Sequence, residues 1–276
     1  MKCITGPKIS ICNLIVRSLS WSDAPKFDYT TPDSTSIGLK DSVRDLGVIL
    51  STDLSFSLHI ERAVTTACQM FGWCLRSFRG RSSYLLITLF KSIVQPHLDY
   101  CSQLWSPTKQ EQINRLEQVQ RAMISKINDN RLKGLDYWQK LSCLQLYSQE
   151  RRRERYQIIL IWKISQCLVA GYGMNFSSCL SRTGRKVVPT ALNFSAPAAV
   201  RNARASTLGV KGAKLFNMMP TSLRNSNHGD IAMFKNHLDI YLANIPDQPT
   251  TQGLARSAGS NSLLDQVPLY ESNVNF

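Results

Sequence analysis

The sequence predicts a mainly α-helical protein, in which a short β-hairpin precedes a helical bundle and a basic loop and disordered C-terminal tail follow it. Two observations carry this fold class. Apolar residues recur at alternating spacings of three and four over most of residues 57–170, the pattern of helices that bury one face. A short run rich in β-branched residues stands before them and has the composition of a strand.

The strand is predicted at Val43 to Leu50, where a polar turn at residues 51–53 closes the apolar run. Ile37 to Leu39 is its expected hairpin partner. Residues 1–36 carry some strand-forming side chains, but their second half is crowded with Ser, Asp, Thr and Pro. We therefore expect residues 1–36 to be poorly ordered or to pair only with this strand, which would leave an exposed sheet edge.

Two amphipathic helices are expected next. The first begins near Ser57, a plausible cap, and its apolar face runs from Ile60 to Phe78. Residues 79–82 interrupt the pattern. It restarts at Leu85, and we expect Pro96 to end the second helix because proline cannot donate the backbone hydrogen bond.

A third helix is predicted from a capping box formed by Thr108 and Glu111, in which each side chain satisfies a free backbone N–H. Its buried face is interrupted by Gln120. Two heptads are too few to argue a coiled coil, so packing within the chain is the default. A shorter, mixed helical segment follows at 132–146.

A long helix is predicted from residues 148–150 to Gly171, which would close it in the left-handed conformation. Its second half is apolar all round, whereas its first turns are basic. Cations are disfavoured there by the helix dipole, so we expect an external anion to compensate them. The four arginines concerned are Arg151, Arg152, Arg153 and Arg155.

Charge points to an acidic partner. The 276 residues carry 33 Lys and Arg against 19 Asp and Glu, a formal net charge of +14. Residues 151–224 hold thirteen of the basic residues and a single acidic one, Glu154. Such a stripe can neutralise phosphates without reading sequence, and the alternative is a solvated basic linker. The predicted nucleic-acid-binding residues are the four arginines together with Arg182, Arg185 and Lys186.

Eight scattered cysteines without CxxC spacing indicate reduced thiols, and we expect a nuclear or cytoplasmic protein. His97 and Cys101 stand four residues apart, but two ligands do not close a zinc site, so no metal is predicted. No apolar run has the length of a membrane span, and no membrane partner is expected. After a short helix around residues 233–242, Pro, Gln, Gly, Ser and Asn predict a disordered tail at 246–276.

Several motifs carry a family resemblance. DLGVILSTDLSFSLHI at residues 45–60 is followed by LFKSIVQPHLDYCSQLWSP at residues 89–107. This succession resembles the region just after the palm in reverse transcriptases of jockey-like non-LTR retrotransposons. LEQVQRAMISKI, then KGAKLFNMMPTSLRN and FKNHLDIYL, resemble later segments of the same polyproteins, and NSLLDQV resembles their ends. The order of the motifs across most of the chain makes the resemblance specific.

The resemblance implies a division of labour. The hairpin around Leu46, Gly47 and Val48 would correspond to the primer grip, and the helices behind it to the thumb. Polymerisation needs two metal ions held by clustered carboxylates. Members of the family hold Mg²⁺ with an upstream palm motif and an Ala-Asp-Asp type turn, yet no adjacent Asp-Asp pair occurs in this sequence. We therefore expect no catalytic residues and no cofactor in this chain, and no polymerase activity from it alone.

Four segments are expected: the end of the palm with the hairpin at 1–56, a helical thumb-like domain at 57–170, a basic loop with a closing helix at 171–245, and the tail. The first functional hypothesis is a truncated C-terminal fragment of an RNA-directed DNA polymerase. Its partners would be RNA or DNA, foremost an RNA–DNA duplex, and the missing palm. The alternative is a stand-alone helical module that binds nucleic acid or protein without an enzymatic role.

Overall fold

The computed structural model describes residues 41–51, 55–169, 174, 186–189, 195, 198–225, 230–249 and 261–274. The chain divides into two compact units, Met1–Ala63 and Val64–Phe276. The described residues are mainly helical, with a two-stranded antiparallel hairpin before the helices, as the sequence predicts. The predicted partner strand at 37–39 lies outside the described residues.

The hairpin belongs to the first unit and is shorter than expected. Strands β1 (Ser42–Asp45) and β2 (Val48–Ser51) pair antiparallel, with Val43 opposite Leu50. The single strand predicted at 43–50 is therefore wrong. Leu46 and Gly47 form the two-residue turn, with φ of 45° and 89°. Positive φ at both positions matches the right-handed twist of the strands, and glycine adopts it without strain.

Helix α2 (Ser57–Ser77) follows and extends into the second unit. Its predicted face is buried, with Ile60, Ala67, Phe71 and Cys74 all below a tenth exposed. The predicted helix is present, but Ser57 is its first helical residue and does not hold the cap position before it.

The second helix runs past its expected end. Helix α3 (Ser83–Leu89) continues through a π-helical turn η1 (Phe90–Val94) into α4 (Gln95–Asp99). Pro96 therefore lies in the first turn of α4 and does not stop the helix. The wider π turn makes this possible, because the N–H groups of a new first turn need no helical partner.

Helix α5 (Gln110–Ile124) begins one residue later than the capping box requires. Lys109 is its N-cap and makes no side-chain capping bond, so the predicted box at Thr108 is wrong. The 3₁₀ turn η2 (Asn130–Leu132) and helix α6 (Tyr137–Cys143) occupy the mixed segment. There a capping box does form, between Asp136 and Gln139.

Helix α7 (Gln149–Ser165) is the central element of the second unit. Ser148 caps its start. It ends earlier than Gly171, because Cys167 takes a left-handed φ of 56°. Leu168 N–H then bonds Lys163 O at 2.9 Å and Cys167 N–H bonds Ile164 O at 3.0 Å, a Schellman closure without glycine.

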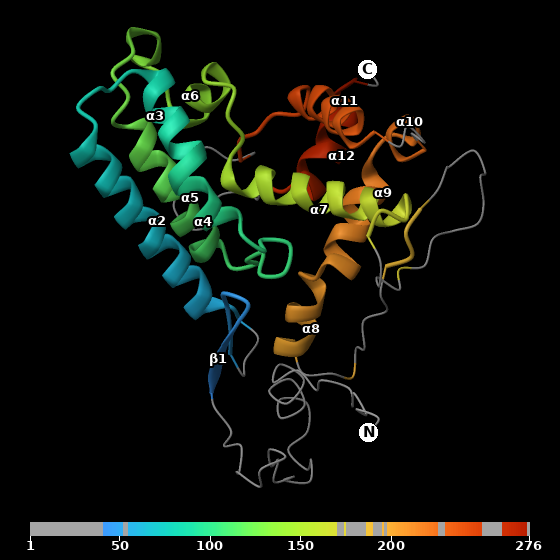
Figure 1. Ribbon diagram of the computed structural model, residues 1–276. Coiled ribbons are helices and arrows are strands. Elements are labelled where there is room, and N and C mark those ends of the chain that lie inside the picture. The colour runs from blue at the N-terminus through green and yellow to red at the C-terminus, as the bar shows by residue number, and fades with distance from the viewer. Residues whose placement is uncertain are drawn as a thin grey trace, which may run out of the picture. The chain divides into compact units, whose positions relative to one another are not determined.

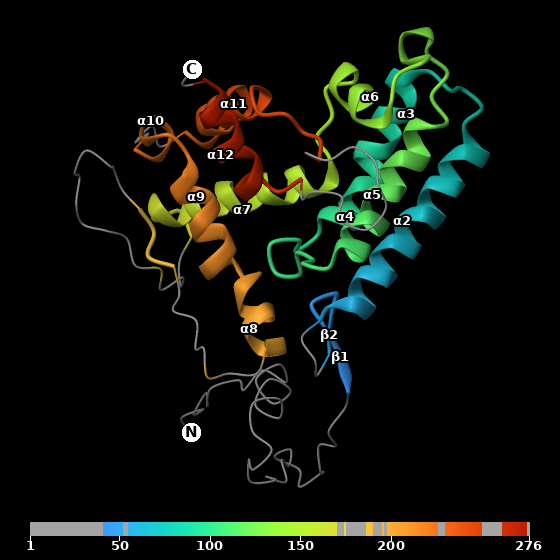
Figure 2. The same ribbon diagram turned by 180° about the vertical axis from the view of Figure 1, so that it is seen from behind.

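Six further elements complete the second unit: α8 (Ala198–Ala205), η3 (Leu208–Gly212), α9 (Ala213–Met218), α10 (Thr221–Arg224), α11 (Ile231–Ala243) and α12 (Leu263–Val274). Helices α9, α11 and α12 lie along α7, and α4 and α5 lie toward its N-terminal end (Figures 1 and 2). Trp162 stacks on Phe234 at 4.4 Å between ring centroids. One apolar cluster thus joins residues of the three segments predicted at 57–170, 171–245 and 246–276.

The tail is ordered where the structure describes it, so the predicted disorder is wrong for residues 261–274. Leu263 is fully buried and Val267 is 2% exposed, and both belong to the apolar cluster around α7. Polar composition suggested disorder, but these two apolar residues lie one helical turn apart and bury together. None of the helices in the described part of the chain combines the length and apolar character needed to cross a bilayer.

Candidate nucleic-acid interface

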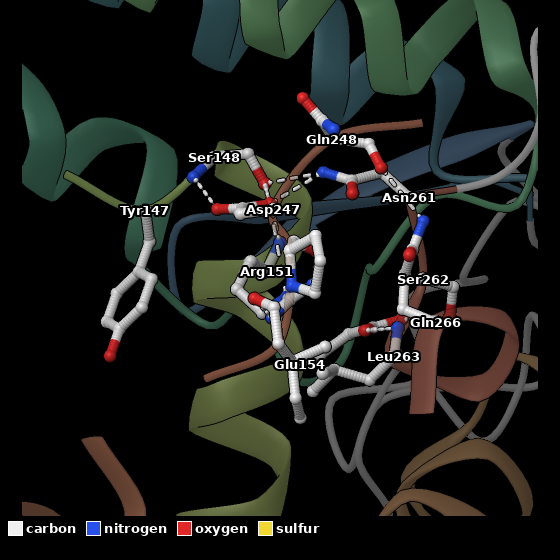
Figure 3. Close-up of polar contacts among 12 residues, drawn as sticks. Tyr147, Ser148, Arg151, Glu154, Asp247, Gln248, Asn261, Ser262, Leu263 and Gln266 are labelled. Carbon is white, nitrogen blue, oxygen red and sulfur yellow. Dashed lines mark hydrogen bonds and ion pairs between the residues drawn. The ribbon is translucent and has the colours of Figure 1, made fainter. Parts of the chain in front are cut away.

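The start of α7, where the sequence places its basic cluster, is capped by side chains from distant parts of the chain. Ser148 accepts the N–H of Arg151 at 3.1 Å and donates its hydroxyl to Asp247 Oδ1 at 2.8 Å. Asp247 also accepts the N–H of Ser148 at 2.7 Å. Asn261 Nδ2 donates to Asp247 Oδ1 at 2.7 Å (Figure 3). A carboxylate of the chain itself thus occupies the positive end of the helix dipole.

Arg151 is enclosed by the residues that follow α11. Its side chain is fully buried. One guanidinium nitrogen donates to Pro246 O at 2.8 Å and the other to Ile245 O at 3.3 Å, and Nε lies 3.9 Å from Asp247 Oδ1. Through these contacts Arg151 holds residues 245–247 against α7.

Arg152 and Arg155 each bind a carboxylate of another helix. Arg152 Nε lies 2.9 Å from Asp99 of α4, which also accepts the Tyr156 hydroxyl at 3.1 Å. Arg155 makes a two-point contact with Asp239 of α11, at 2.6 and 2.7 Å. Bidentate geometry of this kind fixes orientation as well as charge. The two arginines therefore tie α7 to α4 on one side and to α11 on another.

Arg153 is 2% exposed and has no described hydrogen-bond partner at either terminal nitrogen. Burial lowers the pKa of its guanidinium, and the nearby Glu150, Glu117 and Asp99 oppose that effect. Arginine stays protonated in proteins, so this charge is compensated by attraction through space. Gln157, one turn later, is also buried, without a described partner for its amide.

Glu154 connects α7 to the C-terminal helix. Its carboxylate is 1% exposed and accepts the Ser262 hydroxyl at 2.6 Å and the Leu263 N–H at 2.7 Å. Lys211 of η3 lies 2.8 Å from the same carboxylate. Glu154 therefore caps the N-terminus of α12 from another helix, and Figure 3 shows this contact beside the Asp247 cluster.

A second buried carboxylate, Glu117 of α5, meets the first turn of α7. It accepts the N–H of Gln149 at 2.8 Å and the hydroxyl of Tyr137. Burial raises the pKa of Glu117 to about 7, although these hydrogen bonds act in the opposite direction. Burial and then the neighbouring Glu154 likewise raise the pKa of Glu150 to about 7. Both carboxyl groups titrate close to neutral pH.

The arginine cluster is thus part of the core of the second unit. Arg151 and Arg153 are out of solvent, where phosphates of a nucleic acid do not reach them, and Arg152 and Arg155 already bind carboxylates. The expected external anion is replaced by carboxylates of the chain itself. Sequence reasoning missed this because the compensating residues, such as Asp99, Asp239 and Asp247, lie 53 to 96 positions away in the chain.

The other predicted site residues are spread over the chain. Leu46 is 84% exposed at the hairpin turn, Gly47 follows it, and Val48 is buried at 3%. Lys186 is exposed beside Val187, whose N–H and C=O both bond the Asn217 side chain at 2.8 Å. Arg182 and Arg185 lie outside the described residues.

The first turn of α2 adds a residue to the hairpin that the sequence did not single out. His59 is 6% exposed and accepts the N–H of Ile49 at Nδ1, at 3.3 Å. Burial, and then Arg62 and Arg44, lower the pKa of this imidazole. The neutral ring can accept the hydrogen bond that ties β2 to α2.

Some residues that the sequence analysis did not assign to the site share one signal, a polar side chain on a face that is otherwise apolar. Gln120 interrupts the buried face of α5 and donates to Tyr147 O at 2.9 Å. Gln149 and Gln95 exchange amide hydrogen bonds of 3.1 Å. Buried polar groups need partners, so Gln120 and Glu117 mark a helix contact in the sequence, although not the identity of the partner.

Metal ligation finds no support in the described part of the chain, where no three His, Cys, Asp or Glu side chains are grouped as a metal site requires. Burial raises the pKa of the Cys68 and Cys74 thiols. These two cysteines carry little thiolate at neutral pH, which makes them poor nucleophiles.

Comparison with known proteins finds no match: no family model, no curated protein and no solved structure is significantly similar to the chain.

Proposed function

We propose that the chain is the post-palm part of a non-LTR retrotransposon reverse transcriptase, in which it supports the primer grip and contacts the nucleic-acid duplex. One observation supports this above the others. The Leu46–Gly47 turn lies at the tip of a real hairpin, and helices follow it directly, in the order that the motif resemblance implies. Trp105, which is buried, belongs to the second motif of the resemblance, at residues 89–107.

The proposed role is structural and electrostatic. The chain has no adjacent Asp-Asp pair, so the metal-binding carboxylates of polymerisation would belong to the palm, which would supply the Mg²⁺ chemistry. The helices would hold the duplex in register for that palm. Contact with phosphates would fall to exposed basic side chains, since α7 uses its arginines internally.

The test is binding and extension by the purified chain with an RNA–DNA primer–template. Binding should weaken as salt rises, with a slope of about 0.9 in log K against log salt for each phosphate contact on a duplex. With nucleotides and Mg²⁺ added, the primer should not be extended. Template-dependent extension would overturn the assignment of the carboxylates to another segment, and absent duplex binding would overturn the proposed role.

A helical binding module without a link to polymerisation is the second candidate. The observation that favours it is the apolar cluster that α7 organises in the second unit, which gives that unit a core of its own. Such a module would bind single strands or proteins as well as an RNA–DNA hybrid. Preference for the hybrid over other nucleic acids in the same binding assay separates the two candidates.

A further inference from the structure

Two turns of the second unit meet at one end of its helices. The N–H of Asn128, after α5, donates to Arg81 O, between α2 and α3, at 2.8 Å. The Asp129 carboxylate accepts a hydrogen bond from the side chain of Ser83. Residues 78–84 and 125–134 therefore lie side by side, and Figures 1 and 2 show both turns near the label of α3. Helix α6 contacts the same region through η2.

We call these two turns, together with the adjoining helix ends at residues 73–84 and 121–140, the tip, and this region is strongly basic. Residues 73–84 and 121–140 contain eight basic and two acidic residues. The Asp129 carboxylate lies 2.7 Å from the Arg131 guanidinium, so it does not neutralise the other basic side chains of the tip. Arg79, Lys126 and Lys133 are exposed and make no ion pair with a described carboxylate. Unlike the arginines of α7, these charges are not neutralised by carboxylates of the described residues.

Aromatic side chains accompany the tip charges. Tyr84 is 81% exposed in the first turn of α3, and Phe78 is 38% exposed after α2. The guanidinium of Arg121 lies 3.8 Å above the centre of the Tyr137 ring. An exposed tyrosine ring contributes nothing to the core, whereas it offers a flat face on which an unpaired base can stack.

The helix dipole explains only part of this arrangement. Arg76 and Arg121 lie in the last turns of α2 and α5, where cations are favoured. Arg81 donates to Leu75 O and Phe78 O, which closes the end of α2. Neither the helix dipole nor the closing of α2 by Arg81 explains the exposed charge of Lys133 or the exposed ring of Tyr84.

We propose that the tip binds single-stranded nucleic acid, with Arg79, Lys126 and Lys133 on phosphates and Tyr84 stacked on a base. A charged surface alone would suit any duplex, but the exposed ring selects a strand whose bases are unpaired. The inference goes beyond the proposed function, because the tip needs neither a palm nor a primer–template duplex.

The test uses the full chain and fluorescence anisotropy with a labelled oligouridylate and oligothymidylate of about 16 nucleotides, the upper site size for such proteins. Tyr84→Ala should weaken binding at least about fivefold, as loss of one stacked base implies. Tyr84→Phe is the matched control and should bind within about twofold of the unaltered chain, since it keeps the ring. Neither variant should change binding of a duplex of equal length.

The charges are tested separately. A triple variant with Arg79→Gln, Lys126→Gln and Lys133→Gln should lower the slope of log K against log salt by about 2, since each contact on a single strand contributes about 0.7. A matched triple variant at exposed lysines elsewhere should lower it by less than one contact. Its substitutions are Lys91→Gln, Lys109→Gln and Lys214→Gln.

Four results would overturn the proposal: no binding to either oligonucleotide, an equal loss of duplex binding in Tyr84→Ala, equal slopes in the two triple variants, or unchanged affinity in Tyr84→Ala. Polyglutamate is the probe for an acidic protein partner. Tighter binding to polyglutamate than to the oligonucleotides, lost in the triple variant at Arg79, Lys126 and Lys133, would also overturn the proposal. Because primer–template binding is a separate measurement, failure here leaves the proposed function standing or falling on its own test.

Discussion

Glu154 of α7 accepts hydrogen bonds from Ser262 and Leu263 at the N-terminus of α12, and its removal should detach that end of the helix. Glu154→Ala leaves the buried Leu263 N–H without its acceptor and Lys211 without its counter-charge. Breaking one partner of a buried pair costs about 3–5 kcal/mol, and hydrogen bonds to charged groups are worth about 1.5–3 kcal/mol each without adding fully. We therefore expect a loss of about 4 kcal/mol in the free energy of unfolding.

Urea denaturation measures the loss, and hydrogen exchange locates it. In Glu154→Ala, the amides of α12 should exchange much faster than those of α5. Glu111→Ala removes an exposed carboxylate from the first turn of α5 and serves as the control, with an expected loss of no more than about 1 kcal/mol. A loss below about 1 kcal/mol in Glu154→Ala, or unchanged protection of α12, would refute the reasoning.

Three further perturbations test other parts of the account. Burial raises the pKa of the Glu117 carboxyl from 4.5 to about 7, so the folded state binds this proton more tightly than the unfolded state. The free energy of unfolding should therefore fall as pH rises from about 4.5 to 7. Urea denaturation should give a lower free energy of unfolding at pH 8 than at pH 5, and Glu117→Gln should reduce this difference. At the hairpin turn, Leu46→Asn should stabilise β1 and β2 by about 0.5–1 kcal/mol, because asparagine tolerates the positive φ of this position. The amides of Val48 and its neighbours should then exchange more slowly. Faster exchange would contradict the turn geometry. Gly212→Ala places a methyl group 2.8 Å from Leu208 Cδ1 and 3.0 Å from Ile161 Cδ1, so thermal unfolding should report a loss of about 1–3 kcal/mol; an unchanged midpoint would mean that η3 does not approach α7 this closely.

Helix faces were predictable because they depend on spacing alone. The apolar positions of α2 from Ile60 to Cys74 repeat every three or four residues, and those positions are buried. The short helix expected around residues 233–242 is likewise present as α11, with Phe234, Leu238 and Leu242 inside. Local periodicity fixes which face of a helix turns inward, whatever that face then contacts.

Contacts between distant residues were not predictable from the same patterns. The basic turns of α7 suggested a surface for phosphates, since nothing local marks Asp239 or Asp247 as their partners. The π turn that carries Pro96 into α4 is equally invisible in the periodicity. For the tip, the sequence contains the charges and rings, but it does not show that the two turns meet, as the bond from Asn128 N–H to Arg81 O does.

The structure changes where nucleic-acid binding is to be sought. The basic residues between Arg151 and Arg155 are adjacent in the sequence, but three of them bind α4, α11 and the 245–247 segment to α7. The net charge of +14 therefore does not show where positive charge is exposed on the surface. Exposed basic residues outside α7 are the ones to vary first.

The most direct test of the post-palm proposal is to sequence the transcript that encodes the chain on the 5′ side of the Met1 codon. The proposal predicts that the same reading frame continues upstream into a palm with an Ala-Asp-Asp type motif. A transcript that begins near Met1, or an upstream frame without those carboxylates, would contradict it and leave the chain as a helical nucleic-acid-binding or protein-binding module.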